Sequence, residues 1–196
     1  MTLNPGHKRW ARRLSNVIGF DDAPHVRGSK GSQVGLIGCV CSGTRLDIVV
    51  RDVIQKDGTD VTATMTRLVQ DKNLTHVRAV LLQGITFGGF NVVDIHTLSK
   101  NLDMPVLVVA RKNPRLHLIF EAVKAVDGWQ AKRELMEAAG TPEKCRDVWV
   151  QRAGLTLDEA HGMLERTTEH GIIPEPLRLA HIIAGGTTTG KSRGRT

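Results

Sequence analysis

The sequence predicts an α/β protein with a central mixed sheet of five to six strands and helices on both faces. Two β-rich runs, 33–41 and 46–55, flank Ser42-Gly43-Thr44, which is a hairpin signal. Later in the chain, the apolar runs 77–82 and 105–110 alternate with segments of helical spacing. Hairpins followed by strand–helix units are typical of a mixed sheet that is covered on both sides. With 196 residues, the chain is expected to form one domain with a substantial core.

The remaining elements follow in chain order. Residues 17–21 form the expected first strand, and 23–32 form a loop. The turn Asp57-Gly58-Thr59-Asp60 precedes a helix to about residue 72, with Thr59 or Asp60 as its cap. Beyond it we expect a short strand at 148–151 and helices at 91–101, 114–123, 129–139, 156–169 and 174–184.

Charge and composition favour a nucleic-acid partner. The formal net charge is +7, and a basic surface attracts phosphates. With three Trp, four Phe and no Tyr, a base-stacking platform is poorly supported. No apolar run is long enough to span a membrane, and no cleavable signal sequence is evident. The three cysteines, Cys39, Cys41 and Cys145, form no disulfide framework, so we expect a protein of the reducing cytoplasm with no membrane partner.

The segment from residue 82 to residue 94 carries the strongest functional signal. It reads as a buried strand, a glycine-rich turn and an apolar-periodic segment. The carboxyl end of a strand is where α/β proteins place ligands. Gly84, Gly88 and Gly89 allow positive φ or a close approach to the backbone. The alternative is a strand-to-helix connection that needs glycines only to turn.

Two further segments agree with a functional interpretation. Gly19-Phe20-Asp21 ends the first strand, and Pro174-Glu175-Pro176-Leu177-Arg178-Leu179-Ala180-His181 begins the last helix. Together with Gly84-Ile85-Thr86-Phe87-Gly88-Gly89-Phe90-Asn91-Val92-Val93-Asp94, they resemble endonuclease V and, more closely, an archaeal family related to it, the endonuclease dU-like proteins. The resemblance covers about residues 16–186. It departs from the archaeal pattern after the Asp-Asp pair, where Ala23-Pro24-His25 replaces Gly-Pro-Phe.

The resemblance implies a ribonuclease H-like fold and a DNA-repair endonuclease. Its expected substrate is nucleic acid, DNA rather than RNA, that contains a deaminated base such as deoxyuridine or deoxyinosine. Its expected cofactor is Mg²⁺, or Mn²⁺, held by carboxylates that converge from separate strands. The expected organisation is one domain over residues 1–186 and a flexible basic tail over 187–196.

The resemblance also implies the carboxylates of the site. Asp21 is the expected central metal ligand, and Asp60 is an auxiliary carboxylate that is also well placed as an ordinary helix cap. Asp22 faces the opposite side of a strand, so we expect it to support the site from outside the metal's ligands. Endonuclease V has Asp-Gly where this chain has Gln83-Gly84, and an amide brings no charge to a cation. Either Asp94 replaces the missing carboxylate, or the metal site is weak, or the chain no longer cleaves.

Basic residues complete the expected site. Lys112 follows the fifth strand and is expected to contact the scissile phosphate, with Arg111 equally well placed by charge. Arg178 is expected to bind phosphate or a structural carboxylate such as Glu175. His181 is either a packed structural residue or a contributor to the site.

Residues 185–192 match the P-loop pattern letter by letter, yet we expect no ATP binding. A P-loop lies between a strand and a helix, whereas a helix is expected before this segment and only four residues follow it. Two other functions remain open. One is a nucleic-acid-binding module that has lost efficient catalysis, and the other is a small-molecule site at the glycine-rich turn.

Overall fold

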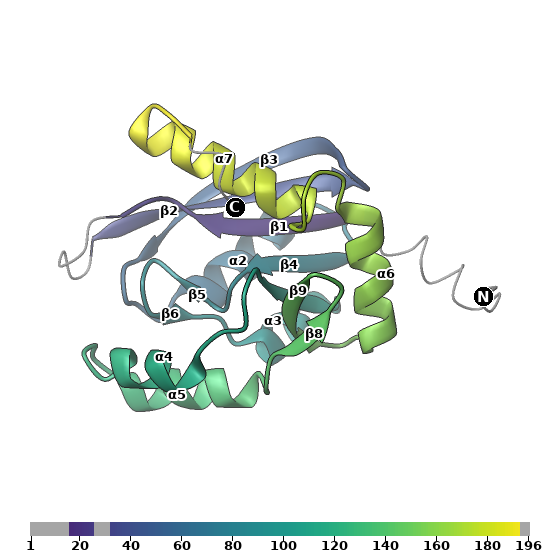
Figure 1. Ribbon diagram of the computed structural model, residues 1–196. Helices are drawn as coiled ribbons and strands as arrows, with labels where there is room; N and C mark the ends of the chain where they lie inside the picture. Colours follow the sequence, from purple (N-terminus) through teal and green to yellow (C-terminus); the bar gives the residue numbers. More distant parts are fainter. Residues whose placement is uncertain (1–15, 26–31, 193–196) are drawn as a thin grey trace.

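The computed structural model describes residues 16–25 and 32–192. Within them, seven strands form one sheet (Figure 1), in the order β3 (Arg45–Gln55), β2 (Gln33–Ser42), β1 (Asn16–Asp22), β4 (Ala79–Gln83), β7 (Val106–Ala110), β9 (Val148–Ala153) and β8 (Glu143–Cys145). The mixed α/β class is confirmed, but the expected number of strands was too low. The three-residue strand β8 was missed because it is too short to show an alternating pattern.

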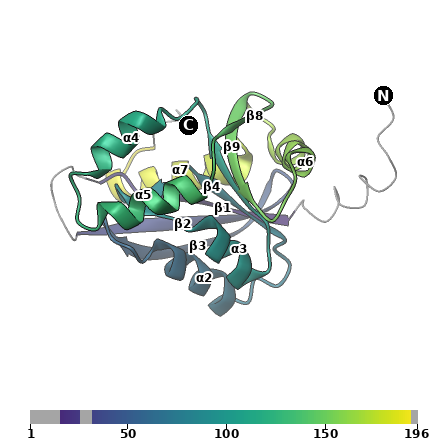
Figure 2. The same ribbon diagram turned by 90° about the horizontal axis from the view of Figure 1, so that it is seen from below.

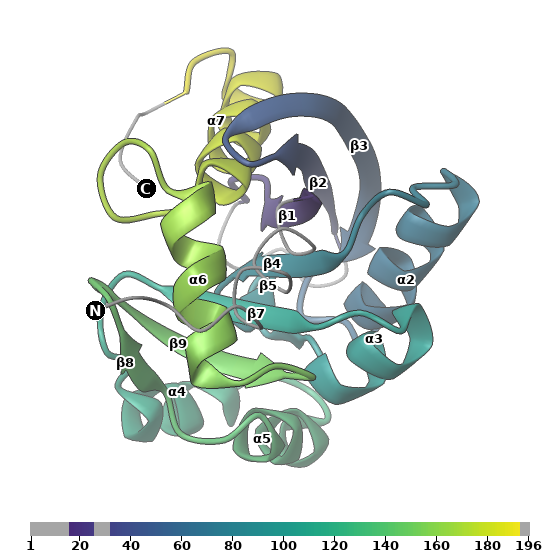
Figure 3. The same ribbon diagram turned by 90° about the vertical axis from the view of Figure 1, so that its right-hand side faces the viewer.

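Helices cover both faces of the sheet, as predicted (Figure 3). One face carries α6 (Leu157–Thr167) and α7 (Glu175–Thr189), and the other carries α2 (Val61–Asp71) and α3 (Ile95–Leu102). The remaining helices, α4 (Leu116–Val123) and α5 (Trp129–Ala138), pack against each other (Figure 2). No helix of the described residues is both long and apolar enough to cross a membrane.

The three central strands, β1, β4 and β7, run parallel to one another. Their carboxyl ends therefore meet at one edge of the sheet. Val17 lies opposite Ala79 and Phe20 lies opposite Leu82. Side chains at neighbouring register positions share a face of the sheet, so the next pair, Asp21 and Gln83, points to the same face.

The predicted helix over 91–101 was wrong in its first turn. Thr86–Phe87 (β5) and Asn91–Val92 (β6) form a small antiparallel hairpin, and α3 begins only at Ile95. The carboxylate of Asp94 accepts hydrogen bonds from the first backbone N–H groups of α3, so it fixes the start of the helix. The β-branched Val92 and Val93 favour the extended chain before it.

Helix α7 is longer than expected and runs through the proposed boundary at residue 187. It buries Ala180 and Ala184 against the sheet and ends at Gly190, which has a φ of 72°. The P-loop-like pattern therefore begins inside a helix, with Gly185 and Gly186 in helical conformation. The strand–loop–helix arrangement that holds a nucleotide triphosphate is absent from the described residues 185–192.

The close approach of α7 to β1 predicts the effect of one substitution. A Cβ atom at Gly19 would lie 2.6 Å from the backbone carbon of Pro176. We expect Gly19→Ala to lower the free energy of unfolding by about 1–3 kcal/mol, as overpacking does. Gly186→Ala is the control, because a Cβ there meets nothing within 4 Å. Replacing glycine inside a helix should stabilise by about 0.5–1 kcal/mol. Urea denaturation of both variants measures the two changes, and an unaltered midpoint for Gly19→Ala would contradict the prediction.

Candidate active site at the carboxyl ends of β1 and β4

Asp21 is a buried carboxylate at the end of β1, and its side chain is 7% exposed. Its Oδ2 lies 2.8 Å from Nδ1 of His181, which comes from α7. Its Oδ1 accepts a hydrogen bond from the backbone N–H of Asp22. Contact between Gly19 and Pro176 holds α7 close enough to β1 for the imidazole to reach the carboxylate. The sequence grouped Asp21 with His181, and the structure brings them together.

Burial raises the pKa of Asp21, although the hydrogen bond and the charge of His181 oppose the rise. The same hydrogen bond raises the pKa of His181. The pKa of Asp21 is raised although His181 lies beside it, so the attraction of His181 does not fully offset the cost of burying the ionised carboxylate. The site therefore favours additional positive charge close to Asp21.

Asp22 points away from Asp21 and supports the glycine-rich turn. Its Oδ2 accepts a hydrogen bond of 3.0 Å from the backbone N–H of Gly88, and Nδ1 of His25 lies 3.4 Å from the same oxygen. Burial and the neighbouring charge of Asp21 raise the pKa of Asp22 to about 6. Two adjacent carboxylates thus disfavour each other's ionised form, which a cation would offset.

The glycine loop, residues 84–90, is held from two sides. Gly88 donates to Asp22, and Gly89 lies against Asp57 so closely that a Cβ would collide with the Asp57 carboxylate. Oδ1 of Asp57 accepts a 2.8 Å hydrogen bond from the backbone N–H of Phe90. Gly84, Gly88 and Gly89 all have positive φ, as predicted for this loop.

Gln83 occupies the end of β4, where we expected a neutral metal ligand in place of the carboxylate of endonuclease V. Its Oε1 is fully buried and has no hydrogen-bond partner among the described residues. A buried amide oxygen without a partner is costly, and few occur in a native protein. The register of β1 and β4 places the Gln83 side chain on the face of the sheet that Asp21 shares.

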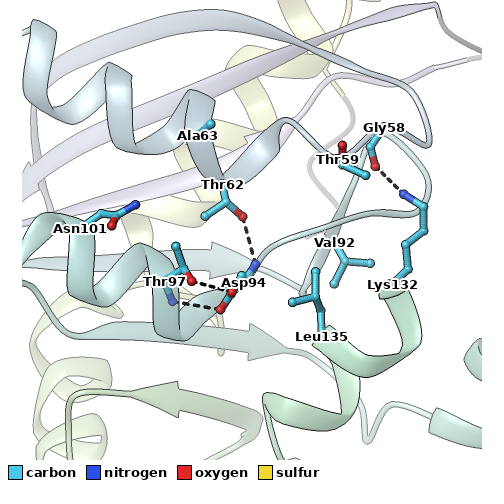
Figure 4. A pocket seen from close by; sticks show the side chains of 10 residues that line it. All are labelled: Gly58, Thr59, Thr62, Ala63, Val92, Asp94, Thr97, Asn101, Lys132 and Leu135. Atoms are coloured by element: carbon cyan, nitrogen blue, oxygen red, sulfur yellow. Dashed lines mark hydrogen bonds between the residues drawn. The ribbon is translucent and has the colours of Figure 1, made fainter. Parts of the chain in front are cut away.

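Asp60 and Asp94 have structural contacts of their own. The carboxylate of Asp60 accepts from Nδ2 of Asn91 at 2.6 Å and from the backbone N–H of Gln55. Asp94 caps α3 and also binds the hydroxyl of Thr97. It lines a cavity of about 300 Å³ that includes neither Asp21 nor Gln83 (Figure 4). The structure does not bring Asp60 or Asp94 into contact with Asp21.

The predicted basic residues fall into two groups. Arg111 and Lys112 are exposed and follow β7 directly, next to the end of β4, where Gly84 donates to the carbonyl of Val109. Arg178 instead binds the buried Glu175 through paired hydrogen bonds of 2.7–2.9 Å. Burial opposes the ionised form of Glu175, but Arg178 outweighs it and lowers the pKa of Glu175. Arg178 is therefore committed to a structural carboxylate.

Three contributors were missed by sequence reasoning alone. Asn91 bonds both to Asp60 and to the backbone of Val61, and its place just after the glycine loop was its only signal. His25 approaches Asp22, and the sequence gave it no ligand spacing. Lys132 is a buried cation on α5, and nothing in the sequence singled it out.

The mixed α/β fold resembles that of endonuclease V. Human endonuclease V superposes with a TM-score of 0.55 at 14% identity, over 89% of this chain and 87% of that chain. Endonuclease V of Ciona intestinalis, solved with inosine-containing DNA, superposes with a TM-score of 0.55 at 13% identity, over 85% of this chain and 82% of that chain. At such identities the likeness shows the fold alone.

Sequence relatives give the family. A UPF0215 protein of Deinococcus radiodurans is 47% identical over 184 residues, which are 93% of this chain and 94% of that protein. A protein of unknown function from Archaeoglobus fulgidus has a crystal structure that superposes with a TM-score of 0.80 at 30% identity, over 86% of this chain and 95% of that chain. The family model for endonuclease dU matches residues 13–188, so the chain belongs to the endonuclease dU family.

The pairing of His181 with Asp21 predicts a measurable titration. Because the folded-state pKa of His181 is raised, the stability that the charged imidazole contributes is complete below its ordinary pKa of about 6.5 and is lost as pH rises through the folded value. In an NMR titration His181 should titrate above its ordinary pKa, and Asp21→Asn should lower that pKa. Asp47→Asn, at an exposed ion pair with Arg45, is the control and should leave it unchanged. An unshifted His181 in the wild-type protein would contradict the arrangement.

Proposed function

We propose that this protein is a divalent-metal-dependent endonuclease that cuts nucleic acid containing deaminated bases, on a ribonuclease H-like fold. The observation that carries the proposal is the buried Oε1 of Gln83, which has no hydrogen-bond partner among the described residues. The Gln83 side chain lies on the same face of the sheet as Asp21. Deoxyuridine and deoxyinosine are the proposed lesions, in DNA rather than RNA. Membership of the endonuclease dU family supports this substrate class.

The donor set fits a hard cation. Mg²⁺ and Mn²⁺ prefer carboxylate and amide oxygens, and Asp21 and Gln83 supply one of each from adjacent parallel strands. Burial raises the pKa of both Asp21 and Asp22, and a bound cation would favour their ionised forms. When bound, such a cation would polarise the scissile phosphate and make a bound water more acidic.

The chain's own residues hold and orient the reacting groups. His181 fixes the Asp21 carboxylate through Nδ1, and Asp22 fixes the glycine loop through the N–H of Gly88. Arg111 and Lys112 are exposed beside this edge and would bind phosphates of the strand. Gly84 has open space where a Cβ would stand, so a strand can approach the backbone there.

A nucleic-acid-binding module without efficient cleavage is the second candidate. One observation favours it, namely that the described residues contain no group of three His, Cys, Asp or Glu side chains able to hold a metal ion. Gln83 is neutral, and Asp60 and Asp94 are engaged in structural hydrogen bonds. Asp21 is then the main charged ligand for a metal ion. The two candidates differ in turnover and share the binding of strands.

A cleavage assay on labelled strands tests the proposal. We expect Mg²⁺-dependent cutting of strands that carry deoxyuridine or deoxyinosine, and none of undamaged strands. Asp21→Asn should lower the rate by at least about 100-fold while the fold is kept, because it removes the charge that holds the cation. Asp47→Asn, an exposed acid in β3, should cut like the wild-type protein. Equal cutting by folded Asp21→Asn would remove Asp21 from the mechanism, and binding without cutting would favour the second candidate.

The Gln83→Asp variant distinguishes a weak metal site from a strand end that no longer binds metal. Restoring a carboxylate should tighten Mn²⁺ or Mg²⁺ binding, measured by calorimetry, and should raise the cleavage rate. Without metal, we expect the buried charge to cost about 3 kcal/mol of stability, which added metal restores. Gln130→Asp adds the same charge at an exposed position of α5 and should show neither effect. Destabilisation that no metal reverses, with no gain in cutting, would decide against the nuclease.

A further inference from the structure

Lys132 is a buried cation that the proposed chemistry does not use. It lies on α5 and is only 2% exposed. Its Nζ donates to the backbone carbonyl of Asp57 at 3.0 Å. It also donates to the backbone carbonyl of Gly58, as Figure 4 shows. Burial lowers the pKa of Lys132, and the charges of Asp57 and Asp60 oppose that change. A buried charge is costly unless it is hydrogen-bonded, and the two carbonyls supply those bonds here.

Lys132 holds the turn between β3 and α2. Asp57 in this turn has a φ of 54°, a left-handed conformation that is uncommon outside glycine. All three polar groups of Asp57 are bonded: the N–H to the carbonyl of Gly88 at 2.8 Å, the carboxylate to the N–H of Phe90, and the carbonyl to Lys132. Lys132 therefore fixes the position of Asp57, which in turn forms two hydrogen bonds with the glycine loop.

The bonds continue from the glycine loop to the carboxylates. Asp57 bonds to Gly88 and Phe90, and Gly88 donates to Asp22, the neighbour of Asp21 in β1. An unbroken series of hydrogen bonds thus joins α5 to the candidate active site. Helix α5 also packs against α4, which follows Arg111 and Lys112 in the chain. Helix α5 of this pair therefore carries Lys132. Helix α4 follows Arg111 and Lys112, the residues that we propose to contact phosphate, closely in the chain.

We propose that Lys132 is a positioning residue, which fixes the glycine loop and Asp22 through the Asp57–Gly58 turn. Its effect on cleavage rests on the proposed nuclease function, whereas its effect on the loop does not. If Nζ is removed, the carbonyls of Asp57 and Gly58 lose their donor and the turn loses its link to α5. The loop then opens more often, and Asp22 loses its fixed donor.

Lys132→Met tests the proposal, because methionine keeps the length of the side chain and removes its donors. Amide hydrogen exchange of the full chain should become about tenfold faster at Gly88 and Phe90, and stay unchanged at Leu81 and Leu82 in β4. Lys124→Met is the control: it removes one charge at an exposed pair with Glu121 and should leave the exchange of all four amides unchanged. Should Lys132→Met fail to fold, Lys132→Gln is examined by the same criteria.

Cleavage kinetics give a second measurement. We expect kcat of Lys132→Met to fall about tenfold with KM unchanged, because misplaced groups slow the reaction without weakening the binding of the strand. Unchanged exchange at Gly88 and Phe90 in the folded variant overturns the proposal, and so does faster exchange spread evenly over β4. A wild-type protein that cuts no strand overturns the nuclease function, and exchange at the two amides then decides the role of Lys132 alone.

Discussion

The contact between α7 and β1 is the constraint on which the candidate site depends. Because Gly19 has no side chain, the backbone of Pro176 can pack directly against β1, in space that a Cβ atom at position 19 would need. That approach seats the first turns of α7 directly over the end of β1. One turn of helix further on, His181 reaches Asp21. The pair unites residues 160 positions apart, and the burial that raises the pKa of Asp21 comes from the same packing.

Charge is concentrated where the three parallel strands end. Asp21 is buried and the adjacent Asp22 is partly buried, while the neighbouring strand end offers only the amide of Gln83. Such an edge has acceptors in excess of donors, in a chain whose net charge is +7. The positive charge beside this edge of the sheet lies on exposed residues such as Lys112, which can bind a phosphate. The proposed nuclease would use both features, because acceptors hold a metal ion and exposed cations bind phosphates.

Patterns that depend on local chemistry were predicted correctly. The apolar central strands, the positive φ of the glycine loop and the placing of Asp21 at a strand end all follow from sequence. The hairpin inside the glycine-rich segment was missed, because its two strands have only two residues each and are too short to show an alternating pattern. The structural roles of Asp94 and Lys132 could not be predicted, because spacing along the chain does not reveal which carboxylate caps a helix or which lysine is buried. Such roles are set by contacts between distant elements.

The glycine loop has a shape that its own sequence does not determine. Gly89 leaves room for the carboxylate of Asp57, and that carboxylate in turn supplies the acceptor for Phe90. A side chain at position 89 and a carboxylate at position 57 exclude each other sterically. The two positions are thus free to change only together, although they lie on separate elements of the fold. Transplanted into another scaffold, the glycine-rich segment would keep its flexibility and lose its form unless the carboxylate that shapes it were carried along.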